Sequence, residues 1–234
     1  MNILITGASR GIGAATYELL KSRSQSVVGH STKGSADLIA GDLSDAKAPR
    51  DIWDTALDEL DGQIDVLVNN AGIYEAVPDN ATDDEWHAAW HRTLTINLQA
   101  AADLSKLAVS HFLDLGISGR IINVASRAAW RGDSAQHWHY AASKSALIGM
   151  TKTIARAYAA EGILCFAVAP GFTVSEMTED YLQGRGGAAI VADIPLGRVA
   201  STTEVAEVIR WLATEAPASA TGTTIDVNGA SYVR

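Results

Sequence analysis

The sequence is short of cysteine and of clustered positive charge, and each shortage excludes a class of protein. Its 234 residues contain one cysteine, Cys165, so an intramolecular disulfide is excluded and a reducing cytosol is favoured. Eighteen Lys and Arg residues stand against 27 Asp and Glu, which gives a formal net charge of −9. Duplex nucleic acid and anionic membranes attract clustered Lys and Arg, and no such cluster appears, so neither is expected as a partner.

Targeting and membrane segments are also lacking. The opening MNILITG passes from Met into a short apolar run and a glycine turn, with no basic flank, so we expect no signal peptide. No apolar run reaches the ~18 residues that a membrane-spanning helix needs. We therefore expect a cytoplasmic protein, and the absence of a break in composition predicts a single domain over residues 1–234.

Short apolar runs such as DVLV, RIIN and ILCFAVA alternate with longer amphipathic segments along most of the chain. Strands that alternate with helices indicate βαβ units, and strands apolar on both faces are typical of a parallel sheet covered on both sides. The predicted class is α/β, a three-layer doubly wound parallel sheet of Rossmann-like type. The acidic stretch DNATDDEW is expected to begin a helix capped by Thr82 or Asp83 rather than to bind a metal.

A glycine-rich turn, ILITGASRGIG, joins the first expected strand to the first expected helix. Gly7, Gly11 and Gly13 permit positive φ and allow backbone N–H groups to approach a diphosphate at the helix N-terminus. Alone, the same turn is compatible with a tight connection that binds nothing, because its spacing differs from GxGxxG.

Four further motifs follow in order along the chain. They are NNAG at 69–72, Ser126 in IINVAS, Tyr140 and Lys144 in YAASK, and Pro170 with Gly171 in VAPGF. With TGASRGIG they resemble the motifs of the short-chain dehydrogenase/reductase family, and the resemblance covers nearly the whole chain. It implies a Rossmann-like fold and hydride transfer between a nicotinamide cofactor and a ketone or secondary alcohol.

The end of the second expected strand, SVVGHSTK, has no carboxylate to bind the ribose 2′-OH of NAD. Arg10, with Ser31 or Thr32, would instead suit the 2′-phosphate of NADP, so NADP(H) is expected to be preferred, with NAD(H) as the alternative. The segment between His30 and Asp42 is short for this family, and a helix there is expected to be truncated or replaced by a loop. The resemblance implies these cofactor-binding residues: Gly7, Ser9, Arg10, Gly11, Ile12, Gly13, Ser31, Thr32, Asp42, Leu43, Asn70, Ala71, Gly72, Tyr140, Lys144, Pro170, Gly171, Phe172, Thr173 and Ser175. For Asp42, a turn residue that caps the next helix remains the alternative.

Tyr140 and Lys144 are spaced i, i+4, which places both on one face of a helix. An ammonium group near a phenol is expected to lower the tyrosine pKa, and a positioned phenol can protonate the alkoxide that hydride transfer leaves. By the resemblance, Tyr140 is the general acid/base, Lys144 also binds the nicotinamide ribose, Ser126 orients the carbonyl, and Asn97 interrupts a helix and supports a proton-relay water.

The loop between Ser126 and Tyr140 is one residue longer than is usual in the family, so the pocket is expected to differ there. Trp130, His137 and Trp138 are candidates for lining the substrate pocket, with a subunit contact as the alternative for His137 and Trp138. The six histidines do not form a zinc motif, and no metal site is predicted. Residues 175–195 are expected to form a substrate lid.

Two alternatives to a small-ketone reductase remain open. One is a nucleotide-sensing protein without chemistry, although Ser126, Tyr140, Lys144 and Asn97 are all kept. The other is reduction of 3-oxoacyl groups on an acyl carrier protein in fatty-acid synthesis, although the chain itself is acidic like such a carrier. Arg127 and Arg131 near the pocket and Arg185 on the lid would supply its basic rim. The helices expected around 98–113 and 140–160 are apolar and alanine-rich around more than one face. In the family that the chain resembles these helices pair between subunits, so the resemblance implies a homotetramer, with a dimer as the alternative.

Overall fold

Seven parallel strands form the centre of the computed structural model, which describes residues 1–173 and 187–234. The strand order is β3-β2-β1-β4-β5-β6-β7, so the chain builds outward from β1 in one direction and then returns to build in the other. This is the predicted doubly wound arrangement. The strands are β1 (Asn2–Ile5), β2 (Ser26–Ser31), β3 (Leu38–Ala40), β4 (Val66–Asn69), β5 (Arg120–Val124), β6 (Leu164–Pro170) and β7 (Thr224–Val227).

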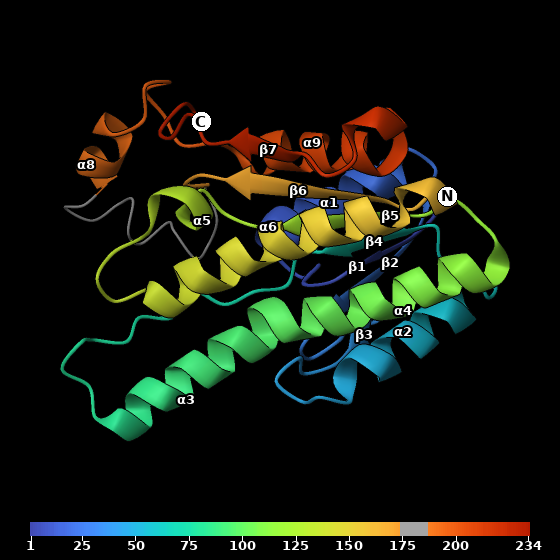
Figure 1. Cartoon of the computed structure of the whole chain (residues 1–234), viewed down its shortest axis with the longest axis horizontal. Coiled ribbons are helices and arrows are strands. Elements are labelled where there is room, and N and C mark those ends of the chain that lie inside the picture. Colours follow the sequence, from blue (N-terminus) through green and yellow to red (C-terminus); the bar gives the residue numbers. More distant parts are fainter. Residues whose placement is uncertain (174–186) are drawn as a thin grey trace.

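Helices cover both faces of this sheet, as Figure 1 shows. The α-helices are α1 (Gly11–Ser22), α2 (Ala48–Glu59), α3 (Asp83–Leu94), α4 (Ala100–Leu115), α5 (Ala128–Arg131), α6 (Trp138–Tyr158), α8 (Gly187–Ala192) and α9 (Thr202–Thr214). A π-helical turn, η1 (Thr95–Gln99), joins α3 to α4, and short 3₁₀ turns lie at Ala159–Glu161 and Ala218–Ala220.

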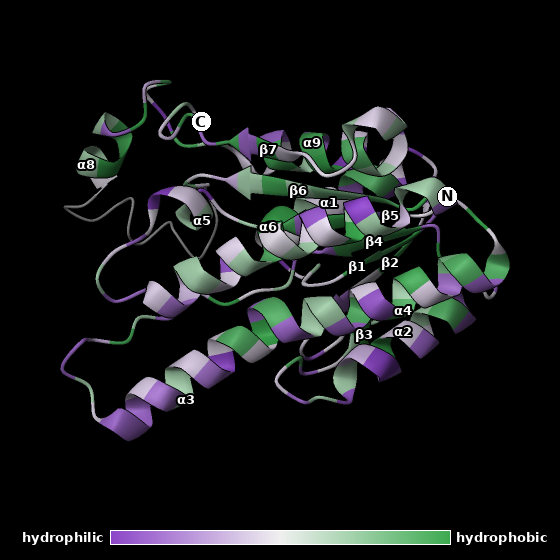
Figure 2. Cartoon of the chain, viewed as in Figure 1, coloured by the Kyte–Doolittle hydropathy of each residue, from purple (hydrophilic) through white to green (hydrophobic). Residues whose placement is uncertain are grey.

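Alternating strand residues divide the core into two layers because successive side chains of a strand point to opposite faces. In β1, Leu4 packs in the layer that includes α2 and α4, whereas Ile3 and Ile5 pack against α1 and α9. The central strands are apolar on both faces, and every residue of β6 is buried. Figure 2 shows the contrast between this hydrophobic centre and the hydrophilic outer end of α3.

Local sequence explains where two of the helices begin. Thr82 caps α3 through the backbone N–H of Glu85, while the Glu85 carboxylate accepts from the backbone N–H of Thr82. Ser201 and Glu204 form the same capping box at α9. The acidic stretch before α3 is therefore a helix start, as predicted.

The connection from β2 to β3 is a turn with no helix in residues 32–37. Its backbone turns at Gly34, which has a φ of 66°, and Ser31 Oγ accepts from the backbone N–H of Gly34. The predicted replacement of a helix by a loop is confirmed. In residues 1–173 and 187–234, no helix combines the length and hydropathy needed to span a membrane.

Candidate active site

A cavity of about 650 Å³ runs along the carboxyl ends of the central strands, where the strand order reverses between β1 and β4. In open α/β sheets, ligands bind at this edge. The loops after β1, β4, β5 and β6 supply most of its lining, and the end of β2 closes one side.

The glycine turn forms one end of this cavity. Gly7 and Gly11 adopt φ values of 68° and 57°, which favour glycine. A Cβ on Gly13 would lie 2.1 Å from the carbonyl oxygen of Gly7, so only glycine fits where α1 approaches the turn. Arg10, the residue that precedes α1, makes no side-chain cap, and the first three residues of α1 line the cavity. This uncapped helix start fits a cofactor diphosphate.

Side chains from the NNAG segment brace that turn. Asn70 Nδ2 donates to the carbonyl oxygens of Thr6 and Gly7, each at 3.0 Å. In return, Thr6 Oγ1 accepts from the backbone N–H groups of Asn70 and Ala71 at 3.1 Å. Two motifs that lie 63 residues apart therefore hold each other in place.

His30 adds a second brace that the sequence did not predict. Its side chain is buried between the glycine turn and the start of the β3–α2 connection. The backbone N–H of Gly7 donates to Nδ1 at 3.4 Å, and Nε2 lies 2.8 Å from the carbonyl oxygen of Gly41. Burial lowers the pKa of His30, which favours the neutral ring that this pairing needs.

The side of the cavity near β2 contains the residues expected to select the cofactor. Arg10, Ser31 and Thr32 line it together with Asp42. The Asp42 carboxylate accepts from the backbone N–H and hydroxyl of Ser44, and these bonds hold its pKa below the usual range. Asp42 is therefore a turn residue that faces the cavity, but it does not cap the next helix, because the residue before α2 is Lys47 and α2 has no side-chain cap.

Ser126, Tyr140 and Lys144 lie together at the end of the cavity opposite the glycine turn. Ser126 follows β5, and its Oγ accepts from the backbone N–H of Ala128 at 3.1 Å. Tyr140 and Lys144 lie one turn apart on α6, with the Lys144 Nζ atom 5.8 Å from the Tyr140 ring centroid. Lys144 Nζ donates to the carbonyl oxygen of Val124 at 2.8 Å, which fixes the lysine beside the cavity.

Burial controls the proton affinities of this pair. It raises the pKa of Tyr140 to about 12, although a hydrogen bond with Ser126 opposes the shift. It lowers the pKa of Lys144 to about 8. The expected lowering of the tyrosine pKa is therefore wrong, because desolvation of the phenolate outweighs the other effects.

Asn97 lies in the π-helical turn between α3 and α4, at the predicted interruption of a helix. Its Oδ1 accepts from the backbone N–H of Ile73 at 2.8 Å, and its Nδ2 donates to the Ile73 carbonyl at 3.0 Å. A further bond of 3.3 Å reaches Ser143 Oγ on α6. A Cβ on Gly72 would lie 3.4 Å from Lys144 Nζ, so the loop after β4, Asn97 and the lysine are closely packed.

Comparison with known proteins connects this arrangement to one family. A family model described as enoyl-(acyl carrier protein) reductase matches residues 7–230. The 3-oxoacyl-(acyl-carrier-protein) reductase of Vibrio harveyi is 37% identical over 246 residues, which cover 98% of this chain and 96% of that protein. The chain belongs to the short-chain dehydrogenase/reductase family.

Solved structures of short-chain dehydrogenases have the same fold. A double mutant of a Serratia marcescens short-chain dehydrogenase/reductase superposes with a TM-score of 0.87 at 28% identity, over 99% of this chain and 97% of that one. A Burkholderia cenocepacia short-chain dehydrogenase in complex with NADP has a TM-score of 0.86 at 29% identity, over 98% and 97% of the two chains. As a short-chain dehydrogenase/reductase, the chain is an NAD(P)-dependent oxidoreductase that acts on CH–OH groups.

The cavity brings together every predicted cofactor residue except Ser175, which lies outside the described residues. The predicted lid at 175–195 is likewise described only from residue 187, where α8 begins. Within the described residues, no group of three or more His, Cys, Asp or Glu side chains could hold a metal ion.

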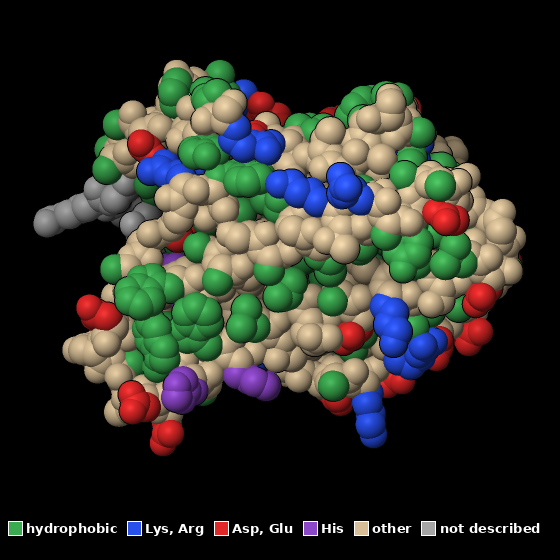
Figure 3. All heavy atoms as spheres, in the orientation of Figure 1, with side chains coloured by type: hydrophobic (Ala, Val, Ile, Leu, Met, Phe, Trp, Pro, Cys, Tyr) green, Lys and Arg blue, Asp and Glu red, His purple; other side chains and the backbone are tan. Residues whose placement is uncertain are grey.

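The three proposed substrate residues do not line the cavity. Trp130 packs against the core, and the cationic ends of Lys152 and Arg234 lie over its ring. Trp138 is 54% exposed and contacts Trp86 instead. Figure 3 shows the hydrophobic side chains gathered over this region of α3 and α6.

His137, the third candidate, is buried one layer behind the cavity wall. Its ring stacks on Tyr74 at a centroid distance of 3.9 Å, and its Nδ1 lies 2.7 Å from Ser134 Oγ. Tyr74 lines the cavity and meets Tyr140 edge-on at 4.8 Å. Sequence reasoning missed Tyr74, although its place directly after the NNAGI segment could have indicated it.

Proposed function

We propose that this protein transfers a hydride between NADP(H) and a ketone or secondary alcohol, and so acts as a carbonyl reductase or alcohol dehydrogenase. The observation that supports this most strongly is one cavity with an uncapped helix start at one end and Ser126, Tyr140 and Lys144 at the other. A nucleotide-sensing protein without chemistry would not need these three side chains to converge.

In the proposed reaction, NADPH supplies the hydride when it is bound. The Tyr140 hydroxyl, kept protonated by burial, donates its proton to the carbonyl oxygen as negative charge develops there. The Ser126 hydroxyl accepts from the N–H of Ala128, and its own proton is available to donate to the same carbonyl oxygen and orient it. Asn97 holds the loop after β4 through the backbone of Ile73, and together with Lys144, which lies close to Gly72 of this loop, it provides a polar route for replacement of the proton.

The cofactor preference is proposed from Arg10, Ser31 and Thr32, which border the cavity where the second strand ends. No carboxylate follows β2 at positions 31–34 to bind a ribose 2′-OH. Arg10→Ala should therefore weaken NADPH binding about ten-fold or more while NADH binding changes little. Equal losses for both cofactors would remove this assignment, and Lys47→Ala serves as a cation-removing control because Lys47 does not line the cavity.

A second candidate is reduction of a 3-oxoacyl group on an acyl carrier protein, which the name of the Vibrio harveyi relative favours. An assay should compare cyclic and acyclic ketones, a 3-oxoacyl thioester and an enoyl thioester with both NADPH and NADH, by absorbance of the reduced nicotinamide. Preference for free ketones supports the leading proposal. Preference for the 3-oxoacyl thioester selects the second candidate, and turnover of none of them would contradict both.

We also propose a homotetramer in the cytoplasm, with a dimer as the alternative. Small side chains on the outer face of α6, including Ala142, Ser145 and Gly149, would allow a second copy to approach closely. A Cβ on Gly149 meets no atom of its own chain within 4 Å. Gly149→Trp should reduce the mass measured by light scattering, and an unchanged mass would contradict the use of this face. The buried free thiol of Cys165 is compatible with a reducing compartment.

A further inference from the structure

Arg127 is a buried cation in the cavity wall, directly after Ser126 in the sequence. Only 11% of its side chain is exposed. Its backbone N–H donates to the carbonyl oxygen of Pro170 at 2.9 Å, which fixes the residue between the ends of β5 and β6. The guanidinium carbon lies 4.8 Å from the ring centroid of Phe172. An aromatic ring against one face of a guanidinium leaves its N–H edge for a planar acceptor.

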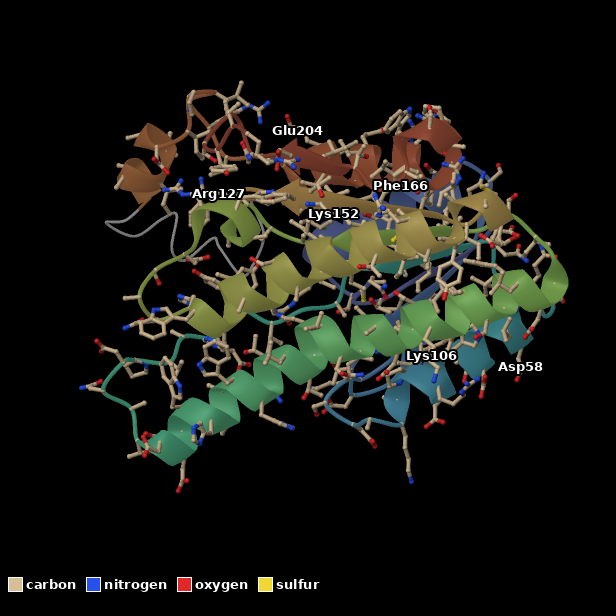
Figure 4. The ribbon with its side chains drawn as sticks, viewed as in Figure 1. Asp58, Lys106, Arg127, Lys152, Phe166 and Glu204 are labelled. Atoms are coloured by element: carbon tan, nitrogen blue, oxygen red, sulfur yellow. The ribbon has the colours of Figure 1, made fainter. Side chains whose placement is uncertain are left out.

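One nitrogen of the Arg127 guanidinium, Nη1, is buried and has no hydrogen-bond acceptor within the described part of the chain. Among the described residues, the carboxylate that pairs with it is that of Asp193, whose Oδ2 lies 3.7 Å from Nη1. That oxygen already accepts from Arg131 Nη1 at 2.5 Å. Figure 4 shows Arg127 in this region between α5 and α8.

The other charged groups nearby do not supply Arg127 Nη1 with a hydrogen-bond acceptor. Arg131 is a second cation, and with burial it lowers the pKa of Arg127, while Asp193 and Asp133 oppose this shift. The Asp133 carboxylate accepts from the Tyr74 hydroxyl at 3.0 Å and from the backbone N–H of Ser134 at 2.7 Å. Two guanidinium groups thus share the single carboxylate of Asp193.

A buried guanidinium without an acceptor is unfavourable, and a carboxylate is the planar anion that matches its fork of N–H donors. We propose that Arg127 is a specificity-determining residue that binds a carboxylate of the substrate. The substrate class is then an oxo acid, or the corresponding hydroxy acid, whose carbonyl reaches Ser126 and Tyr140 while its carboxylate reaches Arg127. This inference rests on the ketone reduction proposed above.

The test compares each acid with its neutral methyl ester, because the two differ mainly in charge at one end. Suitable probes are 4-oxopentanoate, 5-oxohexanoate and 6-oxoheptanoate, each beside its methyl ester, with NADPH. The wild-type kcat/KM for the best acid should exceed that for its ester by about ten- to hundred-fold, the usual effect of a charge-assisted hydrogen bond. Arg127→Gln should bring this ratio close to one, whereas Arg127→Lys should retain part of it.

Two further variants separate recognition from folding. Lys152→Gln removes a cation that lies over Trp130 and does not line the cavity, so the acid/ester ratio should stay at the wild-type value. Asp193→Asn removes the carboxylate that competes for Arg127, so the ratio should rise. A purely structural role of Asp193 would lower the rates of acid and ester alike.

The outcomes distinguish failure of this inference from failure of the proposed function. If the wild type reduces ketones but shows no preference for any acid over its ester, the carboxylate proposal is overturned and the reductase activity stands. A preference for the acid that survives in Arg127→Gln also overturns it. Failure to reduce any ketone refutes the proposed function itself.

Discussion

Replacement of Gly13 by alanine gives the sharpest steric test of the cofactor site. The added Cβ would lie 2.1 Å from the Gly7 carbonyl oxygen and 2.5 Å from Asn70 Nδ2, whereas Cβ atoms in proteins essentially never come closer than 3.0 Å to such an atom. The shift that the Gly7 oxygen requires is therefore at least 3.0 − 2.1, or 0.9 Å. Because the first contact is with backbone, rotation of a side chain cannot supply this shift, and the glycine turn must move.

Overpacking of this kind costs about 1–3 kcal/mol. For a chain of this length the melting temperature should fall by roughly 2–4 °C for each kcal/mol. Displacement of the turn and of Asn70 should raise the NADPH dissociation constant by at least about ten-fold, since the diphosphate needs several N–H groups in register. Titration of nicotinamide fluorescence and thermal unfolding with and without NADPH measure both effects.

Glu18→Ala is the matched control, since Glu18 is exposed on the same helix and does not line the cavity. It should leave cofactor affinity unchanged. If Gly13→Ala binds NADPH as tightly as the wild type, the glycine turn does not hold the diphosphate and the cofactor assignment fails.

Three further predictions concern the braces and the buried lysine. His30→Ala removes the acceptor for the Gly7 N–H and should raise the NADPH dissociation constant about three- to ten-fold, and unchanged affinity in fluorescence titration would show that this brace is dispensable. Asn97→Ala breaks both bonds to the Ile73 backbone and should lower kcat about ten-fold or more, whereas a change confined to KM would contradict its role in the proton route. Burial lowers the pKa of Lys144 from 10.5 to about 8, so between these values the unfolded chain binds more protons and this group makes stability rise with pH. Urea unfolding of the ligand-free protein between pH 8 and 10 should show a smaller rise for Lys144→Met, and identical slopes would refute this account of its burial.

The fold and much of the site could be predicted from the sequence because each motif requires a particular local backbone conformation. The apolar runs predicted the strands, and the glycine turn predicted the positive φ values that Gly7 and Gly11 adopt. The interruption at Asn97 was also predicted, and it is a π-helical turn.

Features that depend on contacts between distant segments could not be predicted in the same way. Trp138 is the first residue of α6, and its exposed ring contacts Trp86. Tyr140, two residues later on the same helix, lines the cavity. His137 contacts the cavity wall through Ser134 and through Tyr74, which comes from the distant loop after β4. The direction of the Tyr140 pKa shift depends on burial by several elements, which no spacing of residues reveals.

The central claim is that the Tyr140 hydroxyl transfers the proton that accompanies hydride transfer. Tyr140→Phe keeps the ring that packs against Tyr74 and removes only the hydroxyl. The most direct measurement is single-turnover reduction of a ketone by this variant with saturating NADPH, alongside titration of NADPH binding. The account predicts a rate lower by at least about a hundred-fold with nearly unchanged cofactor affinity. A rate close to that of the wild type would contradict it.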